Sequence, residues 1–169
     1  MQDHIILIGF MGSGKTTMGI RLSYKLRRTI IDTDKMIEKI EGRSISDIFA
    51  EDGEEYFRKK ETEVLKKLQM EQVPRIISVG GGTPLREENR ALLRELGTVV
   101  YLKASPETVY QRLKGDTTRP LLQGDDPQGK IEALLSERED RYAAAADKII
   151  IVDGKTSAEV LEEIWEVCR

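Results

Sequence analysis

The chain has 169 residues, of which 39% are hydrophobic and 34% charged, and a net charge of -3 at pH 7. This length suits one globular domain with a full core, so we expect a single domain over residues 1–169. The acidic balance gives no basic surface for nucleic acid, which we exclude as a main partner. The lone cysteine, Cys168, excludes an intramolecular disulfide framework.

The start of the chain carries no predicted targeting segment. Met1 leads almost directly into the first expected strand, and no apolar run approaches the length that spans a membrane. We therefore expect a cytoplasmic protein with no signal peptide and no membrane partner. A monomer is the expected state.

The first predicted element is a strand at residues 5–8, followed at once by residues 9–16, which fit the pattern G-x-x-x-x-G-K-[ST]. Glycines let the backbone turn tightly and aim N–H groups inward, and a helix beginning near Gly14 adds the positive end of its dipole. Lys15 supplies a charge for the outer phosphates and Thr16 a hydroxyl for Mg2+. The segment predicts a phosphate-binding loop; the alternative is a plain glycine turn between a strand and a helix.

A short second strand at residues 29–31 runs into Asp32, Thr33 and Asp34. In extended chain, residues two apart point to the same side, so both carboxylates would face one site at the carboxyl end of the strand. The alternative makes Asp34 a plain N-cap of the next helix. That helix ends near residues 42–43, and Ser44 or Ser46 is the expected cap of a short successor.

Residues 52–53 predict a second break, and the pattern from residue 54 to about residue 70 predicts an amphipathic helix. On it Arg58 and Glu61 are three residues apart and therefore neighbours, for which a solvated ion pair is the ordinary interpretation. A third strand at residues 75–79 runs into the glycine run 80–82. Three glycines at a strand end indicate close approach of the backbone to a ligand or a helix; a flexible turn is the alternative.

The second half of the chain continues the alternation of helix and strand. We predict helices at 87–96, from Pro106 and at about 128–146, strands at 98–102 and 148–152, and a last helix capped by Thr156 or Ser157. Trp165 and Cys168 recur on it at the spacing of core or partly buried positions. Residues 115–127 break every periodicity and predict a mobile lid that carries Arg119. Five strands alternating with helices predict an α/β fold with three layers, α/β/α, around a parallel five-stranded sheet.

Taken together and in this order, these motifs resemble the shikimate kinase family over nearly the whole chain. The resemblance rests on residues 9–17, 32–34, 52–61, 80–82, 118–122 and 138–142. It implies a P-loop NTPase fold of the nucleoside monophosphate kinase type, with a substrate-binding region at about residues 33–61 and a mobile lid at about residues 114–127. It also implies ATP-dependent phosphorylation of the 3-hydroxyl of shikimate, giving shikimate 3-phosphate and ADP, in aromatic amino-acid biosynthesis.

The resemblance also implies roles for individual residues. ATP would be held by Gly12, Ser13, Gly14, Lys15, Thr16 and Thr17, and Mg2+ by Thr16 and Asp32. Shikimate would be held by Asp34, Arg58, Gly80, Gly81, Gly82 and Arg138. Lys15, Asp34 and Arg119 would be the catalytic residues, with Arg119 reaching from the lid to the transferring phosphate. Arg112 would lie against adenine and Asp153 in the loop on the adenine side.

The chemistry of shikimate agrees with these residue types. A guanidinium binds a carboxylate bidentately, so Arg58 and Arg138 would take the acid group, with Glu61 orienting Arg58. Asp34 would accept hydrogen bonds from ring hydroxyls and could take a proton, although phosphoryl transfer depends mainly on positioning and charge neutralisation.

Three rival functions share parts of this pattern. Another small-molecule P-loop kinase, acting on gluconate or a nucleotide, would share the loop without needing Asp34, Arg58, the glycine run and Arg138 together. A GTPase switch would need N-K-x-D, but the only asparagine, Asn89, is followed by Arg90. A module that merely binds ATP has no use for Arg119.

Overall fold

The computed structural model describes residues 3–116 and 122–169. Within these ranges one sheet contains five parallel strands in the order β2-β3-β1-β4-β5. The strands are β1 (His4–Ile8), β2 (Ile30–Asp32), β3 (Ile76–Ser78), β4 (Gly97–Lys103) and β5 (Lys148–Ile151). The predicted parallel sheet is confirmed.

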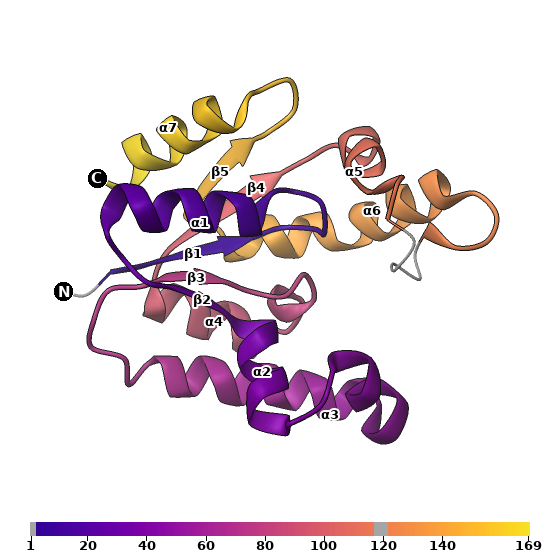
Figure 1. Ribbon diagram of the computed structural model, residues 1–169, viewed down its shortest axis with the longest axis horizontal. Helices are drawn as coiled ribbons and strands as arrows, with labels where there is room; N and C mark the ends of the chain where they lie inside the picture. The colour runs from indigo at the N-terminus through magenta and orange to yellow at the C-terminus, as the bar shows by residue number, and fades with distance from the viewer. Residues whose placement is uncertain (1–2, 117–121) are drawn as a thin grey trace.

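Helices cover both faces of this sheet (Figure 1). α1 (Lys15–Leu26) and α7 (Ser157–Cys168) pack together on one face, and α4 (Glu87–Leu96) and α6 (Pro127–Ala145) pack together on the other. α5 (Pro106–Leu113) packs against α6. α2 (Thr33–Glu41) and α3 (Ile45–Leu68) pack against each other beyond β2, with α3 resting on α4.

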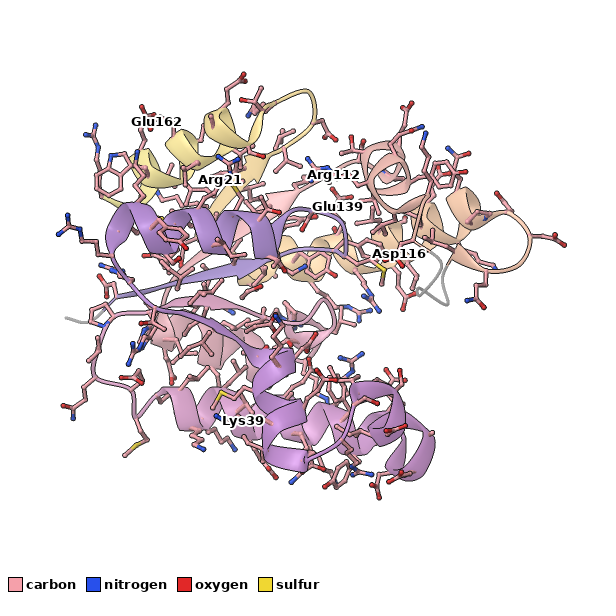
Figure 2. All side chains as sticks on the ribbon, in the orientation of Figure 1. Arg21, Lys39, Arg112, Asp116, Glu139 and Glu162 are labelled. Carbon is pink, nitrogen blue, oxygen red and sulfur yellow. The ribbon has the colours of Figure 1, made fainter. Side chains whose placement is uncertain are left out.

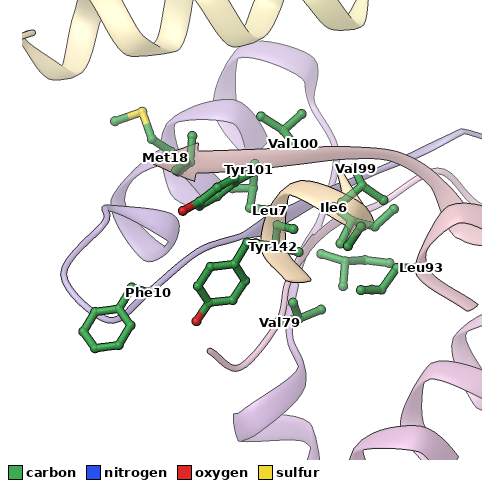
Figure 3. Close-up of a cluster of buried hydrophobic side chains, with 14 of the residues drawn as sticks. Ile6, Leu7, Phe10, Met18, Val79, Leu93, Val99, Val100, Tyr101 and Tyr142 are labelled. Carbon is green, nitrogen blue, oxygen red and sulfur yellow. The ribbon is translucent and has the colours of Figure 1, made fainter. Parts of the chain in front are cut away.

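The core is centred on β1, whose five residues are all buried. A strand that has parallel neighbours on both sides and helices on both faces has no solvated face, which is why 5–8 is a continuous apolar run. Figure 3 shows Ile6 and Leu7 of this strand among side chains of β4 and α6. The rings of Tyr101 and Tyr142 lie 5.2 Å apart there and join the sheet to α6.

The only histidine, His4, is also buried, at the start of β1. Its Nδ1 accepts a hydrogen bond of 2.9 Å from the backbone N–H of Arg75. Desolvation lowers the pKa of His4 from 6.5, against the opposing effect of Glu71. A neutral ring in this place fits the acceptor role, because a protonated Nδ1 could not receive the Arg75 N–H.

Several helix boundaries follow from side-chain caps. Ser44 rather than Ser46 caps α3 by accepting from the N–H of Asp47, and Thr156 caps α7 by accepting from the N–H of Glu159. The break predicted at residues 52–53 is confirmed: Gly53 has a non-helical backbone, with φ 85° and ψ 173°, and α3 consists of two helical segments that meet there at a kink. A positive φ of this kind is open to glycine, so the chain can turn sharply between the two segments.

The order of the strands positions the site. β1 and β3 are neighbours, and the connection after β1 runs to β2 on one side whereas the connection after β3 runs to β4 on the other. Ligands of open parallel sheets bind outside the carboxyl ends of the strands at such a point. At this edge the predicted phosphate-binding loop, residues 9–16, follows β1, and the glycine run, residues 80–82, follows β3. A short 3-10 helix, η1 (Thr83–Leu85), which the sequence did not predict, comes directly after the glycine run.

Two further structural predictions concern the surface. Cys168 packs at the edge of the core and Trp165 is half-buried with the ammonium of Lys25 5.3 Å from its ring, as their helical spacing predicted. None of the helices in the described ranges combines the length and apolar character that crossing a membrane requires.

Candidate active site

A cavity of about 790 Å³ opens at the carboxyl edge of the sheet. It brings together most of the residues predicted for the site, from six separate stretches of the chain. Those lining it are Gly12, Ser13, Gly14, Lys15, Thr16, Thr17, Asp32, Asp34, Arg58, Gly80, Gly81, Gly82, Arg112 and Arg138.

The loop between β1 and α1 forms one wall of this cavity. Gly14, with φ 102°, is the N-cap of α1, so the N-terminal end of the helix, with the positive end of its dipole, lies at the cavity. The Lys15 ammonium folds back over the loop and donates to the carbonyls of Gly9 at 2.7 Å and Phe10 at 3.1 Å. Arg112 reaches over from α5 and donates to the Gly12 carbonyl at 3.0 Å (Figure 2).

Of the two aspartates, Asp32 ends β2 in extended chain, whereas Asp34 already lies in α2. α2 begins at Thr33, and Asp32 is its N-cap: Oδ1 accepts from the backbone N–H groups of Asp34 at 3.0 Å and Lys35 at 3.2 Å. The extended-chain prediction is therefore wrong, and so is the alternative that Asp34 is the cap. Both carboxylates still line the cavity, because the helix begins at the carboxyl end of the strand.

Asp34 is held in an unusual electrostatic environment. Its Oδ1 is buried and has no hydrogen-bond partner among the described residues. Burial, followed by the charges of Glu61 and Asp32, raises the pKa of Asp34 to about 6, while Lys15 and Arg58 oppose the rise. A carboxylate left unpaired in a cavity is costly to stability and is characteristic of functional sites.

Arg58 and Glu61 form a buried ion pair, so the solvated ion pair considered from the sequence is wrong. The guanidinium donates to Glu61 Oε1 at 2.7 Å, and only 1% of the Glu61 side chain is exposed. A second contact, of 3.4 Å, joins Arg58 to the more exposed Glu54. The guanidinium also lies 5.4 Å from the ring of Phe57, within the range of a cation–π contact.

The glycine run 80–82 allows the backbone to pass directly against these charged groups. A Cβ on Gly80 would lie 2.7 Å from Asp34 Oδ1, and one on Gly82 would overlap the Arg58 guanidinium. The close approach predicted from the sequence is confirmed, and the flexible-turn alternative is wrong. Only glycine leaves room for both side chains at this edge.

Arg138 enters the cavity from α6. Its guanidinium lies 5.7 Å from the ring of Phe10, and its Nη1 would lie 3.7 Å from a Cβ on Gly81. Tyr142, one turn further along α6, donates its hydroxyl to the Gly81 carbonyl at 2.7 Å. Arg138 and Tyr142 therefore face the glycine run together.

Sequence reasoning missed several residues of the cavity. It also gave no role to Tyr142, which is not in the lining but supports the glycine run; its signal is that it falls four residues after Arg138 and so lies on the same face of the helix. Ile45 and Phe49 form an apolar wall with Phe57, and the rings of Phe49 and Phe57 are 4.9 Å apart. Lys155, Ser157 and Val160 line the end near α7; nothing in their spacing distinguishes them from ordinary loop and helix residues.

Two predicted residues are not found in the lining. Asp153 accepts from the N–H of Ser105 at 3.0 Å and from its hydroxyl at 2.9 Å, which ties the loop after β5 to the start of α5. Burial works against the ionised form, but hydrogen bonds from Thr108 and Ser105 outweigh it and lower the pKa of Asp153. A contact with adenine stays a prediction. Arg119, with most of its motif, lies outside the described residues, so its role also stays a prediction.

The donor set at the phosphate loop fits Mg2+. Thr16 and Asp32 offer the hard oxygen ligands that this ion prefers, and Asp32 Oδ1 is used by two N–H groups, which leaves Oδ2 for a cation or its water. Among the described residues no group of three or more His, Cys, Asp and Glu side chains could hold a metal. Mg2+ typically uses one or two protein ligands together with phosphates and water, so two oxygens are enough.

Comparison with known proteins identifies the family. The sequence model of the shikimate kinase family matches residues 11–169. A shikimate kinase from Symbiobacterium thermophilum is 44% identical over 165 residues, covering 96% of this chain and 94% of the relative, and one from Deinococcus radiodurans is 45% identical over 163 residues, covering 96% and 81%. Among solved structures, the shikimate kinase from Acinetobacter baumannii in complex with shikimate superposes with a TM-score of 0.89 at 36% identity, covering 98% of this chain and 92% of that one. The chain therefore belongs to the shikimate kinase family.

Proposed function

We propose that this protein is a shikimate kinase that transfers the γ-phosphoryl group of ATP to the 3-hydroxyl of shikimate. The observation that carries the proposal is a single cavity that joins a phosphate loop to a pocket with two arginines and an unpaired carboxylate. The loop fits the donor, and Arg58, Arg138 and Asp34 fit an acceptor with one acid group and several hydroxyls. The shikimate-bound relative from Acinetobacter baumannii supports the choice of acceptor.

The loop at the N-terminus of α1 would hold the phosphates of ATP. Backbone N–H groups of Gly12, Ser13 and Gly14 and of the first helical turn would bind the phosphate oxygens, and Thr17 would add a hydroxyl. Lys15 would exchange its two carbonyl contacts for the outer phosphates, where its charge offsets the charge that develops during transfer. Mg2+, held through Thr16 and Asp32, would neutralise the phosphates.

The acceptor would lie between α3, the glycine run and α6. Arg58 and Arg138 would bind the carboxylate, and the backbone of 80–82 would approach the ring closely because no side chain intervenes. Asp34 would accept a hydrogen bond from the attacking hydroxyl and remove its proton; a pKa of about 6 leaves this carboxylate mostly ionised, yet basic, at pH 7. The apolar wall of Phe49 and Phe57 would exclude water beside the ring.

The remaining roles concern the adenine end and the lid. Arg112, which already crosses the phosphate loop, would lie against adenine, with Asp153 holding the adjacent loop. Arg119 would approach the transferring phosphate as residues 114–127 close over the cavity, excluding water as a competing nucleophile. Residues 1–169 would form one domain, with acceptor-binding residues at about 33–61. The protein would act as a cytoplasmic monomer.

The regiochemistry of the product provides a test. The protein is incubated with ATP, Mg2+ and shikimate, and the product is examined by phosphorus and proton NMR. We expect one phosphate ester, coupled to the proton on carbon 3, and no product when EDTA removes the metal. An ester at carbon 4 or 5, or hydrolysis of ATP without an ester, would contradict the proposed orientation of the acceptor.

A further inference from the structure

Behind the Arg58–Glu61 pair lies a buried chain of polar side chains that none of the roles above uses. It joins Glu61 to Thr83 of η1, Thr83 to Asn89 of α4, and Asn89 to Thr62 of α3. Glu61 is 2% exposed, Thr83 1% and Asn89 0%. Hydrogen bonds in a cluster that excludes water are strong, and breaking any one of them leaves a buried polar group without a partner.

The direction of each hydrogen bond in this chain is determined by its partners. The backbone carbonyl of Thr83 can only accept, so the atom of Asn89 that faces it at 3.0 Å is the amide nitrogen. Asn89 Oδ1 therefore faces Thr62, whose hydroxyl donates to it at 2.7 Å. The Glu61 carboxylate also accepts only, so the hydroxyl of Thr83 donates to Glu61 Oε2.

Glu61 thus receives one donor on each oxygen, Arg58 on Oε1 and Thr83 on Oε2. A carboxylate held at one oxygen can still rotate about its last torsion, whereas one held at both cannot. Its rotation would carry the Arg58 guanidinium with it, because the pair is joined at 2.7 Å. The Arg58 guanidinium in turn lies directly against the backbone of Gly82, which leaves little tolerance for misplacement.

We infer that Thr83 is a positioning residue for the acceptor: Asn89 anchors its backbone carbonyl, and its hydroxyl fixes Glu61 and, through Glu61, the direction in which Arg58 presents its guanidinium. The inference rests on the proposed function, since it assumes that Arg58 binds the acid group of the acceptor. Thr83 touches neither substrate in this account. The inference also explains why a polar side chain is buried in η1 directly after the glycine run.

The test compares three variants of the full chain by calorimetry and steady-state kinetics. Thr83→Val keeps the shape of the side chain and removes the donor, and Thr83→Ser keeps the donor and removes the methyl group. Thr62→Val makes the same isosteric change in the same cluster. It removes a hydroxyl that lies 2.7 Å from Asn89 Oδ1 and 3.2 Å from the Arg58 backbone carbonyl but makes no hydrogen bond to the Glu61 carboxylate, so it serves as the matched control for lost stability.

We expect Thr83→Val to raise the Kd and KM for shikimate by about tenfold, with kcat and the KM for ATP within about twofold of the unchanged protein. Thr83→Ser and Thr62→Val should bind shikimate within about twofold of the unchanged protein, because Glu61 keeps both donors in each. Thr83→Ala gives the same test if the valine variant does not fold.

Unchanged shikimate affinity in a folded Thr83→Val or Thr83→Ala variant would overturn the inference. So would an equal loss in Thr83→Ser, which would assign the effect to the methyl group, or an equal loss in Thr62→Val, which would assign it to general loosening of the cluster. Failure of the unchanged protein to bind shikimate is a different result. It would contradict the proposed function itself, and the inference about Thr83 would fall because it depends on that function.

Discussion

Replacing Asp34 with Asn is expected to lower kcat by about a thousandfold, within the range for loss of a general base, while the protein becomes more stable. The amide keeps the shape of the side chain but cannot take the proton of the attacking hydroxyl. It also removes a charge whose Oδ1 is buried without a hydrogen-bond partner in the described structure. Loss of activity and gain of stability should therefore occur in the same variant.

The gain in stability should depend on pH in a defined direction. Folding raises the pKa of Asp34 from 3.8 to about 6, so the folded state binds this proton more tightly than the unfolded state. Ionising Asp34 therefore destabilises the folded protein progressively from about pH 4 to about pH 6 and fully above that. The shift corresponds to roughly 1–3 kcal/mol, the upper end being the full conversion at 1.36 kcal/mol per pKa unit.

Chemical denaturation at several pH values measures this effect. Asp34→Asn should have the higher free energy of unfolding at pH 7 and nearly the same free energy as the unchanged protein at pH 4. Asp140→Asn, which alters an exposed aspartate on α6, is the matched control and should change neither turnover nor stability appreciably. If the Asp34→Asn protein is no more stable than the unchanged protein at pH 7, or if it retains turnover, Asp34 is not a destabilising catalytic carboxylate and the prediction is wrong.

Replacing Arg58 with Ala is expected to weaken shikimate binding by about a hundredfold or more, as the loss of a desolvated charge pair typically does. ATP binding should be nearly retained, because the phosphate loop lies between β1 and α1 whereas Arg58 lies on α3. The variant should also lose stability, since Glu61 would remain buried without its cation. Titration calorimetry with each ligand separates the two effects.

Arg58→Lys is the companion variant. It keeps a positive charge beside Glu61 and so should recover much of the stability, but an ammonium lacks the planar fork that binds a carboxylate bidentately. We expect shikimate affinity between that of Arg58→Ala and that of the unchanged protein. Equal losses of ATP and shikimate affinity in both variants would show that Arg58 supports the cavity as a whole and does not contact the acceptor.

The fold could be predicted from the sequence because its signals are local. Apolar runs such as 5–8 define strands buried on both faces, and Gly42 ends α2 as expected, with a left-handed φ of 68°. Gly53 is a local signal of the same kind. A glycine flanked by polar residues predicts a break, and the helical path is interrupted at Gly53, with a helical segment of α3 on each side of the kink.

The site was predictable in its residues and less so in its geometry. Sequence motifs predicted both Asp32 and Asp34 as site residues. Which of them caps α2 depends on a difference of two residues in where the helix begins, and spacing does not determine that. The burial of Glu61 depends on η1 and α4 closing over it, two elements more than twenty residues away. Thr83 and Asn89 are ordinary residues in the sequence, and only their contacts with α3 reveal them.

The central claim, that this cavity phosphorylates shikimate, is tested most directly by acceptor-dependent release of ADP. One assay compares shikimate, gluconate and nucleoside monophosphates as acceptors for the same preparation, with ATP and Mg2+ present throughout. We predict release of ADP that depends on shikimate and far exceeds release with the other acceptors. Folded protein that releases no more ADP with shikimate than without it, or that prefers gluconate or a nucleotide, would contradict the claim.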